Sequence, residues 1–362
     1  MKILTVGGAM VDAIAIVDSD QIERITMRNA DTSYLLLEEG RKTEALDIST
    51  HSGGGAVNAA VAMARLGHDV AAMVKLGQDQ RADVILSGLE AEGVSTRWAM
   101  RAAGEKTGAS LIIASHDRNA GIFAFRGANT RIRPDDLKPD AFGADLCYVT
   151  SLSNESADCF PDIVARAKEK DALVAVNPGI RQLSARQGAF RECLGRIDLL
   201  AVNRVEADAL VAGLAGKFGE GGAKIDHDPD AVLPDLLTRG FEGGGFHMTA
   251  RSYFNALMES GPRWVLVTDG RAGAFLATED RLYHCPPAPA DVVGTAGAGD
   301  AYCATLASGL AGGLEPAEAM IRATLNAASV VAHVDTQTGL LDAAALDARR
   351  AEARIEVESW AL

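Results

Sequence analysis

The sequence has no apolar run long enough to cross a membrane as a helix and no closely paired cysteines. A membrane-spanning helix needs about 20 consecutive apolar residues, and no stretch of the 362 residues approaches this length. The five cysteines are scattered and never form a CxxC pair, which favours buried thiols in a reducing cytosol over disulfides or a zinc knuckle. Residues 1–17 indicate a first strand rather than a secretory signal. We therefore expect a cytoplasmic protein with no membrane partner.

Aromatic and positively charged residues are also scarce. Aromatic residues make up 5% of the chain, and 35 Lys and Arg against 49 Asp and Glu give a net charge of −14. Proteins that bind nucleic acids use basic surfaces and aromatic stacking platforms, so we expect no nucleic-acid partner. The seven histidines show no HExxH or HxxxH spacing, which argues against a metal site built from protein ligands alone.

Short apolar runs alternate with amphipathic stretches along most of the chain, which predicts an α/β fold with a mostly parallel sheet. A chain of this length buries roughly 75% of its unfolded surface, enough for a large core. The predicted strands are residues 3–7, 70–76, 146–151, 173–177, 199–203, 264–268 and 274–277, and the clearest helices are residues 56–66, 157–170 and 204–211.

Two segments break this alternation, residues 13–52 and 107–125. They contain alternating apolar and polar stretches at residues 33–37, 43–48, 109–114 and 121–125. This period of two predicts antiparallel strands that pair into a small accessory sheet. A third unusual stretch, residues 213–245, contains nine glycines and is either a mobile surface insertion or a mobile segment over a ligand site.

The strongest chemical signal is the glycine-rich segment that ends in Gly297-Ala298-Gly299-Asp300 and runs directly into a predicted helix. Small residues let backbone N–H groups converge at a helix N-terminus, which is a binding site for anions. Asp300 lies in the same turn, where it can accept a proton from a hydroxyl group that attacks a bound phosphate. The alternative is an ordinary N-cap aspartate. Neither a Walker A loop nor a GxGxxG fingerprint occurs.

A second glycine segment, Gly53-Gly54-Gly55, leads into the helix that carries Asn58. Glycines allow a ligand to approach the backbone closely, and Asn58 offers both a donor and an acceptor. Asp12 follows the first strand, at the carboxyl edge where α/β sheets bind ligands. Taken alone, the glycine segment is equally compatible with an ordinary strand–helix turn, and the Asp12 position favours an exposed loop aspartate over a ligand-binding one.

Two further segments follow predicted strands. Asn203 and Glu206 lie one helical turn apart, so they can either order a magnesium ion through water or form an N-terminal capping box. The segment from Thr268 through Gly270 to Gly273 closes a strand with a tight turn. It is either a hairpin or a loop that contacts a nucleotide.

In this order the segments resemble the PfkB, or ribokinase-like, family of carbohydrate kinases. Two signatures carry the resemblance, the GGxxN helix entry at Gly54–Asn58 and the GAGD turn at Gly297–Asp300. Weaker motifs fall between them in the expected order, at residues 76–79, 126–129, 177–179, 203–206 and 268–273. The resemblance implies a three-layer α/β/α core with a mostly parallel central sheet (residues 1–12, 53–106 and 126–362) and a small antiparallel β lid (residues 13–52 and 107–125).

The resemblance also implies an activity, a phosphotransferase that uses ATP and Mg²⁺ to phosphorylate a primary alcohol of a sugar. Asp300 would be the general base, and the backbone of Gly297, Ala298 and Gly299 would form the anion hole. The implied acceptor-binding residues are Asp12, Gly54, Gly55 and Asn58. The implied nucleotide-side residues are Asn203, Thr268, Gly270, Gly273 and Asn326, with Glu206 near Mg²⁺ through water. Many relatives form homodimers through the lid, so a homodimer is also expected.

One position departs from the family pattern. Relatives usually carry Asp-Thr at the start of the second signature, and here the aspartate is replaced by Gly294. In potassium-activated relatives that carboxylate belongs to the monovalent-cation site, so the replacement argues against activation by K⁺. Two alternatives to a sugar kinase remain, a nucleoside kinase of the same family and a non-catalytic sugar-binding descendant. Only Tyr34, Phe123 and Phe125 could provide an aromatic wall for a nucleobase near the lid.

Overall fold

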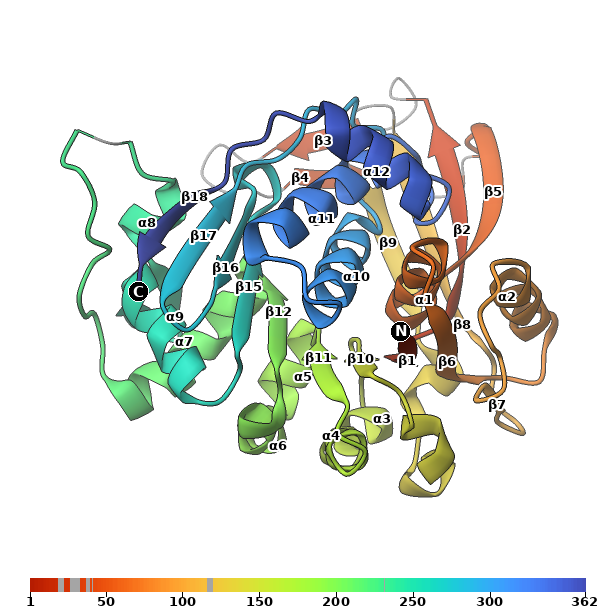
Figure 1. Ribbon diagram of the computed structural model, residues 1–362. Coiled ribbons are helices and arrows are strands. Elements are labelled where there is room, and N and C mark those ends of the chain that lie inside the picture. Colours follow the sequence, from red (N-terminus) through yellow and green to blue (C-terminus); the bar gives the residue numbers. More distant parts are fainter. Residues whose placement is uncertain (19–22, 27–32, 37–39, 41, 116–119, 231) are drawn as a thin grey trace.

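A ten-stranded sheet forms the centre of the molecule (Figure 1). The structure, a computed structural model, describes residues 1–18, 23–26, 33–36, 40, 42–115, 120–230 and 232–362. From one edge of this sheet the first seven strands run parallel to one another, and the last three continue it as an antiparallel edge. In spatial order the strands are β7 (Met100–Arg101), β6 (Asp69–Leu76), β1 (Lys2–Gly7), β10 (Leu146–Val149), β11 (Leu173–Val176), β12 (Leu199–Asn203), β15 (Trp264–Thr268), β16 (Ala274–Ala277), β17 (Arg281–Cys285) and β18 (Glu358–Ala361).

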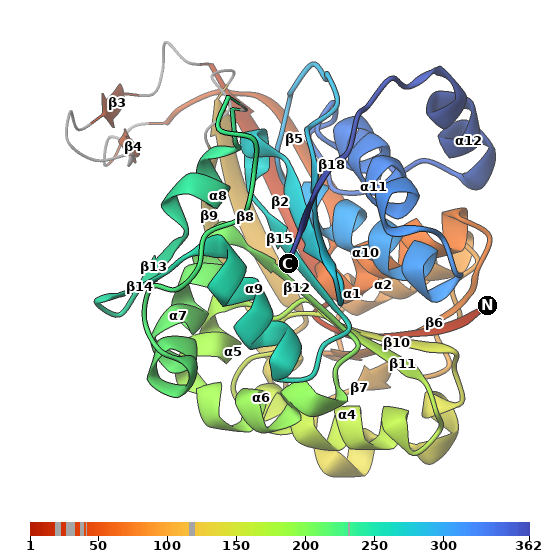
Figure 2. The ribbon, with the colours of Figure 1, turned by 60° about the vertical axis from the view of Figure 1, so that its left-hand side comes forward.

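Helices cover both faces of this sheet, as Figure 2 shows. Successive strand residues point to opposite faces, so in β1 Ile3 belongs to one hydrophobic core and Leu4 to the other. One face carries α1 (Gly55–Arg65), α2 (Gln80–Ala91), α10 (Ala298–Ala311), α11 (Pro316–Val330) and α12 (Ala343–Glu352). The other carries α3 (Glu155–Asp158), α4 (Phe160–Lys168), α5 (Ile180–Ala185), α6 (Gln187–Cys193), α7 (Arg204–Phe218), α8 (Asp235–Arg239) and α9 (Ala250–Glu259).

A separate four-stranded sheet, the lid, consists of β5 (Ala45–Gly53), β2 (Met10–Val17), β8 (Gly108–Ser115) and β9 (Ala120–Phe125) in spatial order. The β5–β2 and β8–β9 pairs are antiparallel, and β2 and β8 are parallel. The predicted lid segments therefore do pair with each other, although β2 begins at Met10 rather than after residue 12. A two-stranded sheet, β3 (Glu23–Thr26) and β4 (Ser33–Leu36), accounts for the predicted strand at 33–37, and Leu37 lies outside the described residues.

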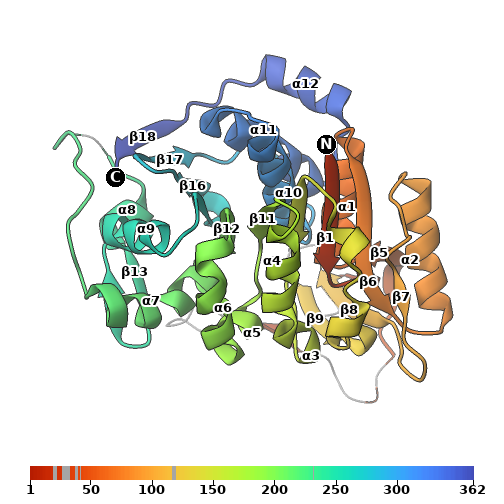
Figure 3. The same cartoon turned by 60° about the horizontal axis from the view of Figure 1, so that its bottom comes forward.

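The glycine-rich stretch 213–245 contains secondary structure that the sequence did not predict. Helix α7 continues to Phe218, and α8 is followed by the hairpin of β13 (Phe241–Gly243) and β14 (Phe246–Met248), which lies beside α7 (Figure 3). Gly244 and Gly245 form the hairpin turn with positive φ. Phe241 is fully buried and stacks on Tyr253 with ring centroids 3.9 Å apart, so this part of the insertion belongs to the core.

The other predicted elements are close to those observed. The long helix predicted at 157–170 is interrupted, because α3 ends at Asp158 and α4 starts at Phe160 with a proline in its first turn. Helix α7 runs seven residues past its predicted end at residue 211. Among the helices of the described residues, none combines the length and the apolar character that a membrane crossing requires.

Candidate active site

The turn around Asp300 has the conformation of a helix N-terminus that is free to bind an anion. Helix α10 begins at Ala298, and its N-cap, Gly297, has a φ of 80°, a left-handed conformation that favours glycine. A Cβ atom on Gly297 would also lie 2.7 Å from the Thr336 side chain. Any other residue at 297 would therefore displace the start of the helix.

The backbone N–H groups of this turn are largely unused. Ala298 N–H has a long bond of 3.4 Å to the Thr295 carbonyl, and in the described part of the chain the N–H groups of Gly297, Gly299 and Asp300 have no backbone acceptor. Gly299 is exposed, and a Cβ atom built on it would meet nothing within 4 Å. The surface beside Gly299 is therefore open, which is compatible with an anion at these amides.

Asp300 lies in the first turn of α10, half-buried, and accepts a hydrogen bond of 2.8 Å from Asn58 Nδ2. Burial raises the pKa of the Asp300 carboxyl above its ordinary value, the bond from Asn58 lowers it in part, and the charge of Asp12 raises it again. The structure thus brings together Asp300, Asn58 and Asp12, three residues that are far apart in the sequence. A desolvated carboxylate with a raised pKa is a stronger proton acceptor than one in water.

Asp12 lies within lid strand β2, not in a loop after the first strand as predicted. The loop consists only of Gly8 and Ala9, because the chain enters the lid immediately after β1. Asp12 is buried and accepts a hydrogen bond from Ser110 of the neighbouring strand. Burial raises the pKa of its carboxyl, and the Ser110 bond and the charge of His51 partly offset this rise.

The glycines before α1 are required by close packing. Gly54 has a φ of 95°, and a Cβ atom on it would lie 2.6 Å from the carbonyl oxygen of Gly8. A Cβ atom on Gly55 would lie 3.0 Å from the side chain of Thr150, at the end of β10. The absence of a Cβ atom at Gly54 and Gly55 lets the N-terminus of α1 pack closely against the chain that leads to Asp12. Asn58 is therefore placed between the lid and α10.

Asn203 and Glu206 form the capping box that the sequence allowed. Asn203 Oδ1 accepts from the Glu206 N–H at 2.9 Å, and Glu206 Oε2 accepts from the Asn203 N–H at 2.9 Å. Burial raises the pKa of Glu206, its bonds with Asn203 lower it, and the charge of Asp300 raises it slightly. Glu206 is thus near enough to Asp300 for the two charges to interact, although α7 and α10 cover opposite faces of the sheet.

A single half-buried carboxylate suits Mg²⁺, which keeps most of its waters and binds phosphate oxygens. Among the described residues, no three His, Cys, Asp or Glu side chains are grouped closely enough to hold a metal by themselves. One carboxylate oxygen of Glu206 is bound to the Asn203 N–H, which leaves the other for a water of the ion. The chain therefore fits a magnesium ion that is held mainly by its substrate.

The predicted nucleotide loop is the turn of a hairpin. Thr268 ends β15, where it is paired with Asn203 on one side and with Ala274 on the other. Gly270 lies in an exposed 3₁₀ turn, and Gly273 has a φ of 89° with its α-carbon packed against the Cys285 carbonyl. The hairpin alternative is therefore confirmed, and its tip lies next to Asn203 at the carboxyl edge of the sheet.

Asn326 does not face this edge. Its side chain is fully buried in α11, where Nδ2 donates to Thr305 Oγ1 at 2.8 Å and Oδ1 accepts from the Leu341 N–H at 2.9 Å. Both polar atoms serve to join α10, α11 and the following loop. The prediction that Asn326 lines a nucleotide pocket is therefore not supported, because a ligand could not reach a side chain enclosed by helices.

The aromatic residues of the lid point away from Asp12. The strand register aligns Asp12 with Ser110, and Ser110 with Ala124. Because side chains alternate between faces, Phe123 and Phe125 lie on the opposite face of the lid. Both are exposed, at 62% and 50%. They cannot form the wall of a nucleobase pocket around Asp12, and the side chain of Tyr34 lies outside the described residues.

The loop that follows α11 contributes to the site, although no motif in the sequence predicted it. Thr336 Oγ1 donates to Asn58 Oδ1 at 2.9 Å, and Gln337 Nε2 donates to the same oxygen at 3.1 Å. Gln337 also joins the lid, since its Nε2 donates to the Ser52 carbonyl at 2.9 Å. The polar run from Asp335 to Thr338 between two apolar segments was the only sequence signal for this loop. The Gly294 N–H bonds to the Val331 carbonyl at the start of the same loop.

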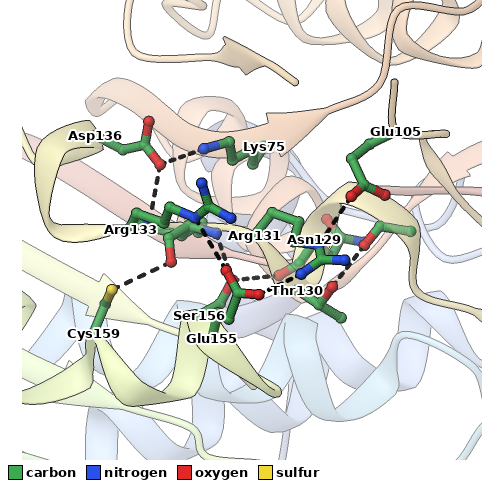
Figure 4. A network of polar contacts seen from close by, with 12 residues as sticks. Lys75, Glu105, Asn129, Thr130, Arg131, Arg133, Asp136, Glu155, Ser156 and Cys159 are labelled. Carbon is green, nitrogen blue, oxygen red and sulfur yellow. Dashed lines mark hydrogen bonds and ion pairs between the residues drawn. The ribbon is translucent and has the colours of Figure 1, made fainter. Parts of the chain in front are cut away.

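Asn129 fixes the point where the lid joins the core (Figure 4). Its amide accepts from the Ala9 N–H at 3.0 Å and donates to the Ala9 carbonyl at 2.8 Å, directly before β2. Its own carbonyl accepts from Ser156 at 2.6 Å, and the adjacent Glu155 pairs with Arg131 and Arg133. Figure 4 shows the part of this network around Ser156, Glu155 and the two arginines. Through the bonds of Asn129 to Ala9, the motif at residues 126–129 has a role in holding the lid.

Asp79 fixes a second lid strand in the same way. As N-cap of α2 it accepts from the Ala82 N–H, and it also accepts from the N–H and Oγ1 of Thr107 at 2.8 and 2.6 Å. Thr107 immediately precedes β8. Two of the intermediate motifs in the sequence, at residues 76–79 and 126–129, are therefore anchors of the lid.

Two curated proteins and one solved structure illustrate what this chain is similar to. The chain is 28% identical over 275 residues to the bifunctional ribokinase/ribose-5-phosphate isomerase A of Fructilactobacillus sanfranciscensis, which covers 74% of this chain but only 44% of that protein. It is 25% identical over 328 residues to the deoxyribokinase of Salmonella typhi, covering 90% of this chain and 94% of that one. The Arabidopsis thaliana ribokinase structure with ribose and ATP superimposes with a TM-score of 0.70 at 20% identity, over 96% of this chain and 97% of that one.

A family profile also matches most of the chain. The description of the matching family is pfkB family carbohydrate kinase, and the match covers residues 2–227 and 242–343. The gap between the two matched segments falls within the glycine-rich insertion and ends at the β13–β14 hairpin. The fold, the order of the motifs and this match agree that the chain belongs to the pfkB family of carbohydrate kinases.

Proposed function

We propose that this protein transfers the γ-phosphate of ATP to a primary hydroxyl group of a sugar or sugar derivative. The observation that carries the proposal is the arrangement at the start of α10. There a desolvated Asp300 carboxylate, oriented by Asn58 at 2.8 Å, lies in the same turn as the N–H groups of Gly297 and Gly299, which have no backbone acceptor among the described residues. A proton acceptor beside an anion site is what phosphoryl transfer to an alcohol requires.

The chemical step follows from this arrangement. The acceptor oxygen attacks the γ-phosphorus, its proton passes to Asp300, and the bond to the β–γ bridging oxygen breaks to release ADP. The N–H groups of Gly297, Ala298 and Gly299 stabilise the charge on the transferring phosphoryl group, where one donor contributes roughly 2.7–4 kcal/mol. A positioned base adds about 10²- to 10⁴-fold.

The two substrates approach Asp300 from opposite sides. Asp12, with Gly54, Gly55 and Asn58, binds the acceptor from the lid side, because a buried carboxylate can accept from a pair of sugar hydroxyls. Asn203, Thr268, Gly270 and Gly273 lie on the nucleotide side. Glu206 would hold Mg²⁺ through water, and the ion would neutralise charge on the phosphates.

Two arginines with interacting charges guide the choice of acceptors to test. Arg126 is half-buried where β9 ends, and Arg181 lies in the first turn of α5. Neither guanidinium pairs with a carboxylate within the described residues. Burial lowers the pKa of Arg126, and the nearby charge of Arg181 lowers it further. An acid group on an acceptor that reached both guanidinium groups would relieve this repulsion, so sugar acids belong among the acceptors tested beside neutral sugars and nucleosides.

The outer face of the lid supports a homodimer. Ile48, Phe123 and Phe125 are 70%, 62% and 50% exposed on the face opposite Asp12, and Leu111 lies between them. A groove of about 930 Å³ runs between this face and Val84 of α2. A monomer rarely leaves such a contiguous apolar surface uncovered, so we expect two copies of the chain to pack through their lids.

The decisive experiment measures ADP release with ATP, Mg²⁺ and a panel of neutral sugars, sugar acids and nucleosides. We expect turnover with at least one sugar or sugar acid, and product phosphorylated at a primary hydroxyl. Turnover of nucleosides alone would favour the nucleoside-kinase alternative, although the outward orientation of Phe123 and Phe125 argues against it. Acceptor binding without any turnover would favour the non-catalytic alternative.

A further inference from the structure

The side-chain amide of Asn58 is the centre of a hydrogen-bond chain that runs from the lid to Asp300. The chain starts at the Ser52 backbone carbonyl, which can only accept, so the group that meets it at 2.9 Å must be Gln337 Nε2. The same Nε2 donates to Asn58 Oδ1 at 3.1 Å. Asn58 Nδ2 then donates to Asp300 Oδ2 at 2.8 Å. One backbone carbonyl therefore sets the direction of every bond in the chain.

Thr336 reinforces this direction. Its Oγ1 donates to Asn58 Oδ1 at 2.9 Å, so both lone pairs of this oxygen are occupied by donors. Asn58 is 3% exposed and Thr336 is 8% exposed. If the Asn58 amide turned over, its NH₂ group would face two donors without water to satisfy it. Such a buried unpaired group costs about 1–3 kcal/mol, so the amide is fixed with Nδ2 towards Asp300.

The loop that carries Thr336 and Gln337 is held firmly on the core side. Arg65 of α1 donates to the Gln337 carbonyl at 2.9 Å and to the Leu340 carbonyl at 2.8 Å. Asp335 accepts from the backbone N–H groups of Gln337 and Thr338, both at 2.8 Å. The position of Gln337 is thus fixed by the core, while its amide reaches the lid.

The lid end of the chain lies next to Asp12. Ser52 belongs to β5 and is paired with Val11 of β2. The next residue, Gly53, packs directly against the Asp12 carboxylate, where a Cβ atom would collide. A displacement of the lid from this position would therefore move both the group proposed to bind the acceptor and the carbonyl that orients Gln337.

From these contacts we propose that Thr336 and Gln337 are positioning residues for the general base, and that Gln337 couples the orientation of Asp300 to the seating of the lid. With the lid in place, Asn58 directs an N–H at Asp300, which favours the ionised carboxylate and keeps it correctly turned. With the lid displaced, Gln337 loses the Ser52 carbonyl, and its amide no longer has a fixed direction. Proton transfer is then coupled to occupancy of the acceptor site. This inference depends on the proposed kinase function.

The two residues separate the two parts of the proposal. Among the described residues the Thr336 side chain hydrogen-bonds only Asn58, whereas the Gln337 side chain hydrogen-bonds both Asn58 and the lid. In Thr336→Val and in Gln337→Met, Asn58 Oδ1 loses one of its two donors, so the amide is held less firmly and its hydrogen bond to Asp300 weakens. We expect the acidic limb of the pH profile of kcat to shift to higher pH by about one unit in both variants. Such a shift means that the ionised form of Asp300 is favoured about tenfold less. Thr336→Ser keeps the donor and should restore the profile.

Only Gln337→Met should also raise the acceptor KM, by about fivefold to tenfold, with the ATP KM unchanged. An unmoved acidic limb in both variants would overturn the positioning role. Equal acceptor KM values in Thr336→Val and Gln337→Met would overturn the coupling to the lid.

A measurement without turnover keeps this test separate from the proposed function. The pH dependence of Tm, compared between the native protein and Asp300→Asn, reports the pKa of Asp300 through linkage. In the protein that retains Asp300, Thr336→Val should shift the pH dependence of Tm that Asp300 causes to higher pH. In the Asp300→Asn background, Thr336→Val should leave the pH dependence of Tm unchanged. If no acceptor is turned over but the shift in Tm is seen, the proposed activity fails while the positioning role stands. If no shift is seen, the positioning role fails by itself.

Discussion

Asp300 is kept in an environment that disfavours its charge. Burial raises its pKa above the ordinary value of 3.8, and Asp12 adds to this effect. The native state therefore binds the Asp300 proton more tightly than the unfolded chain does. The contribution of this group to stability is complete below the ordinary pKa and is lost as the pH rises through the raised pKa. At neutral pH the charge destabilises the fold, by about 1.4 kcal/mol for each unit of pKa shift.

The first prediction follows from the raised pKa of Asp300, which makes its charge destabilising at neutral pH. Asp300→Asn should reduce turnover at least a thousandfold while ATP binding is retained, because the proton acceptor is lost but the backbone N–H groups remain. At pH 7 its Tm should be equal to or higher than that of the native protein, and the advantage should shrink towards pH 4. ADP release, nucleotide titration and thermal denaturation measure these effects. Undiminished turnover would contradict the assignment of the base.

Gly299 gives a second prediction at the residue scale. A Cβ atom at this position would meet no protein atom within 4 Å, so Gly299→Ala should fold normally. The methyl group would nevertheless occupy the space in front of the free N–H groups, where we place the phosphoryl group. We expect kcat to fall about 10²- to 10³-fold, comparable to the loss of an anion-hole donor, with Tm unchanged or slightly raised.

The matched control for this prediction is Gly216→Ala, because Gly216 is also an exposed helical glycine with open space around it. It lies in the second half of α7, away from the start of α10. The control should keep full activity and gain a similar amount of stability. Full activity in Gly299→Ala would mean that the phosphoryl group does not lie in front of this turn.

At the scale of elements, the lid depends on the anchors where its strands join the core. Thr107 Oγ1 donates to Asp79 at 2.6 Å and accepts from the Gly77 N–H at 2.9 Å, immediately before β8. Thr107 is fully buried. The Thr107 hydroxyl therefore connects the start of lid strand β8 to the N-terminus of α2 and to the residue that follows β6.

Thr107→Val should loosen this anchor, because it leaves the Gly77 N–H buried without an acceptor, at a cost of about 1–3 kcal/mol. We expect a lower Tm and a several-fold higher acceptor KM, measured by ADP release, while the ATP KM stays the same. Thr96→Val is the control, since Thr96 bonds Glu90 at an exposed site and its loss should change neither constant. An equal rise in both KM values would show a general structural effect instead.

The β13–β14 hairpin makes a second prediction at this scale. Phe241 is fully buried, stacks on Tyr253 and packs edge-on against Phe254. Phe241→Ala should therefore destabilise the protein by about 3–5 kcal/mol, as measured by denaturant unfolding. A loss below about 1 kcal/mol would mean that the hairpin is a dispensable attachment to the core.

At the scale of the whole molecule, the apolar outer face of the lid predicts the oligomeric state. A dimer of this 37.8 kDa chain should appear in light scattering coupled to size-exclusion chromatography. Phe123→Glu places a charge in the middle of the face, where desolvation would oppose contact, and should shift the protein to monomers. Val232→Glu, at a site that is 94% exposed and outside the lid, should remain a dimer. A native protein that is monomeric at tens of micromolar would contradict the prediction.

Much of the core could be predicted from the sequence, because a strand buried on both faces reads as a short apolar run and a glycine turn constrains its own backbone. The central parallel strands, the helix starts at Gly55 and Ala298 and the capping box of Asn203 and Glu206 all follow from local patterns. The placement of Asp12 did not follow, because its strand pairs with residues 45–53 and 108–115, and such pairing leaves no local signal.

The amino-acid sequence by itself determined the fold class, the family and the turn that carries Asp300. These are properties of residues close together along the chain, where backbone sterics and periodicity decide the structure. Only the tertiary structure decided that Asn326 is enclosed between helices, that Phe123 and Phe125 point outward, and that Thr336 and Gln337 bond Asn58 across 278 and 279 residues of sequence. Burial and the direction of a hydrogen bond depend on what packs against a side chain from elsewhere in the fold, and no local pattern records that.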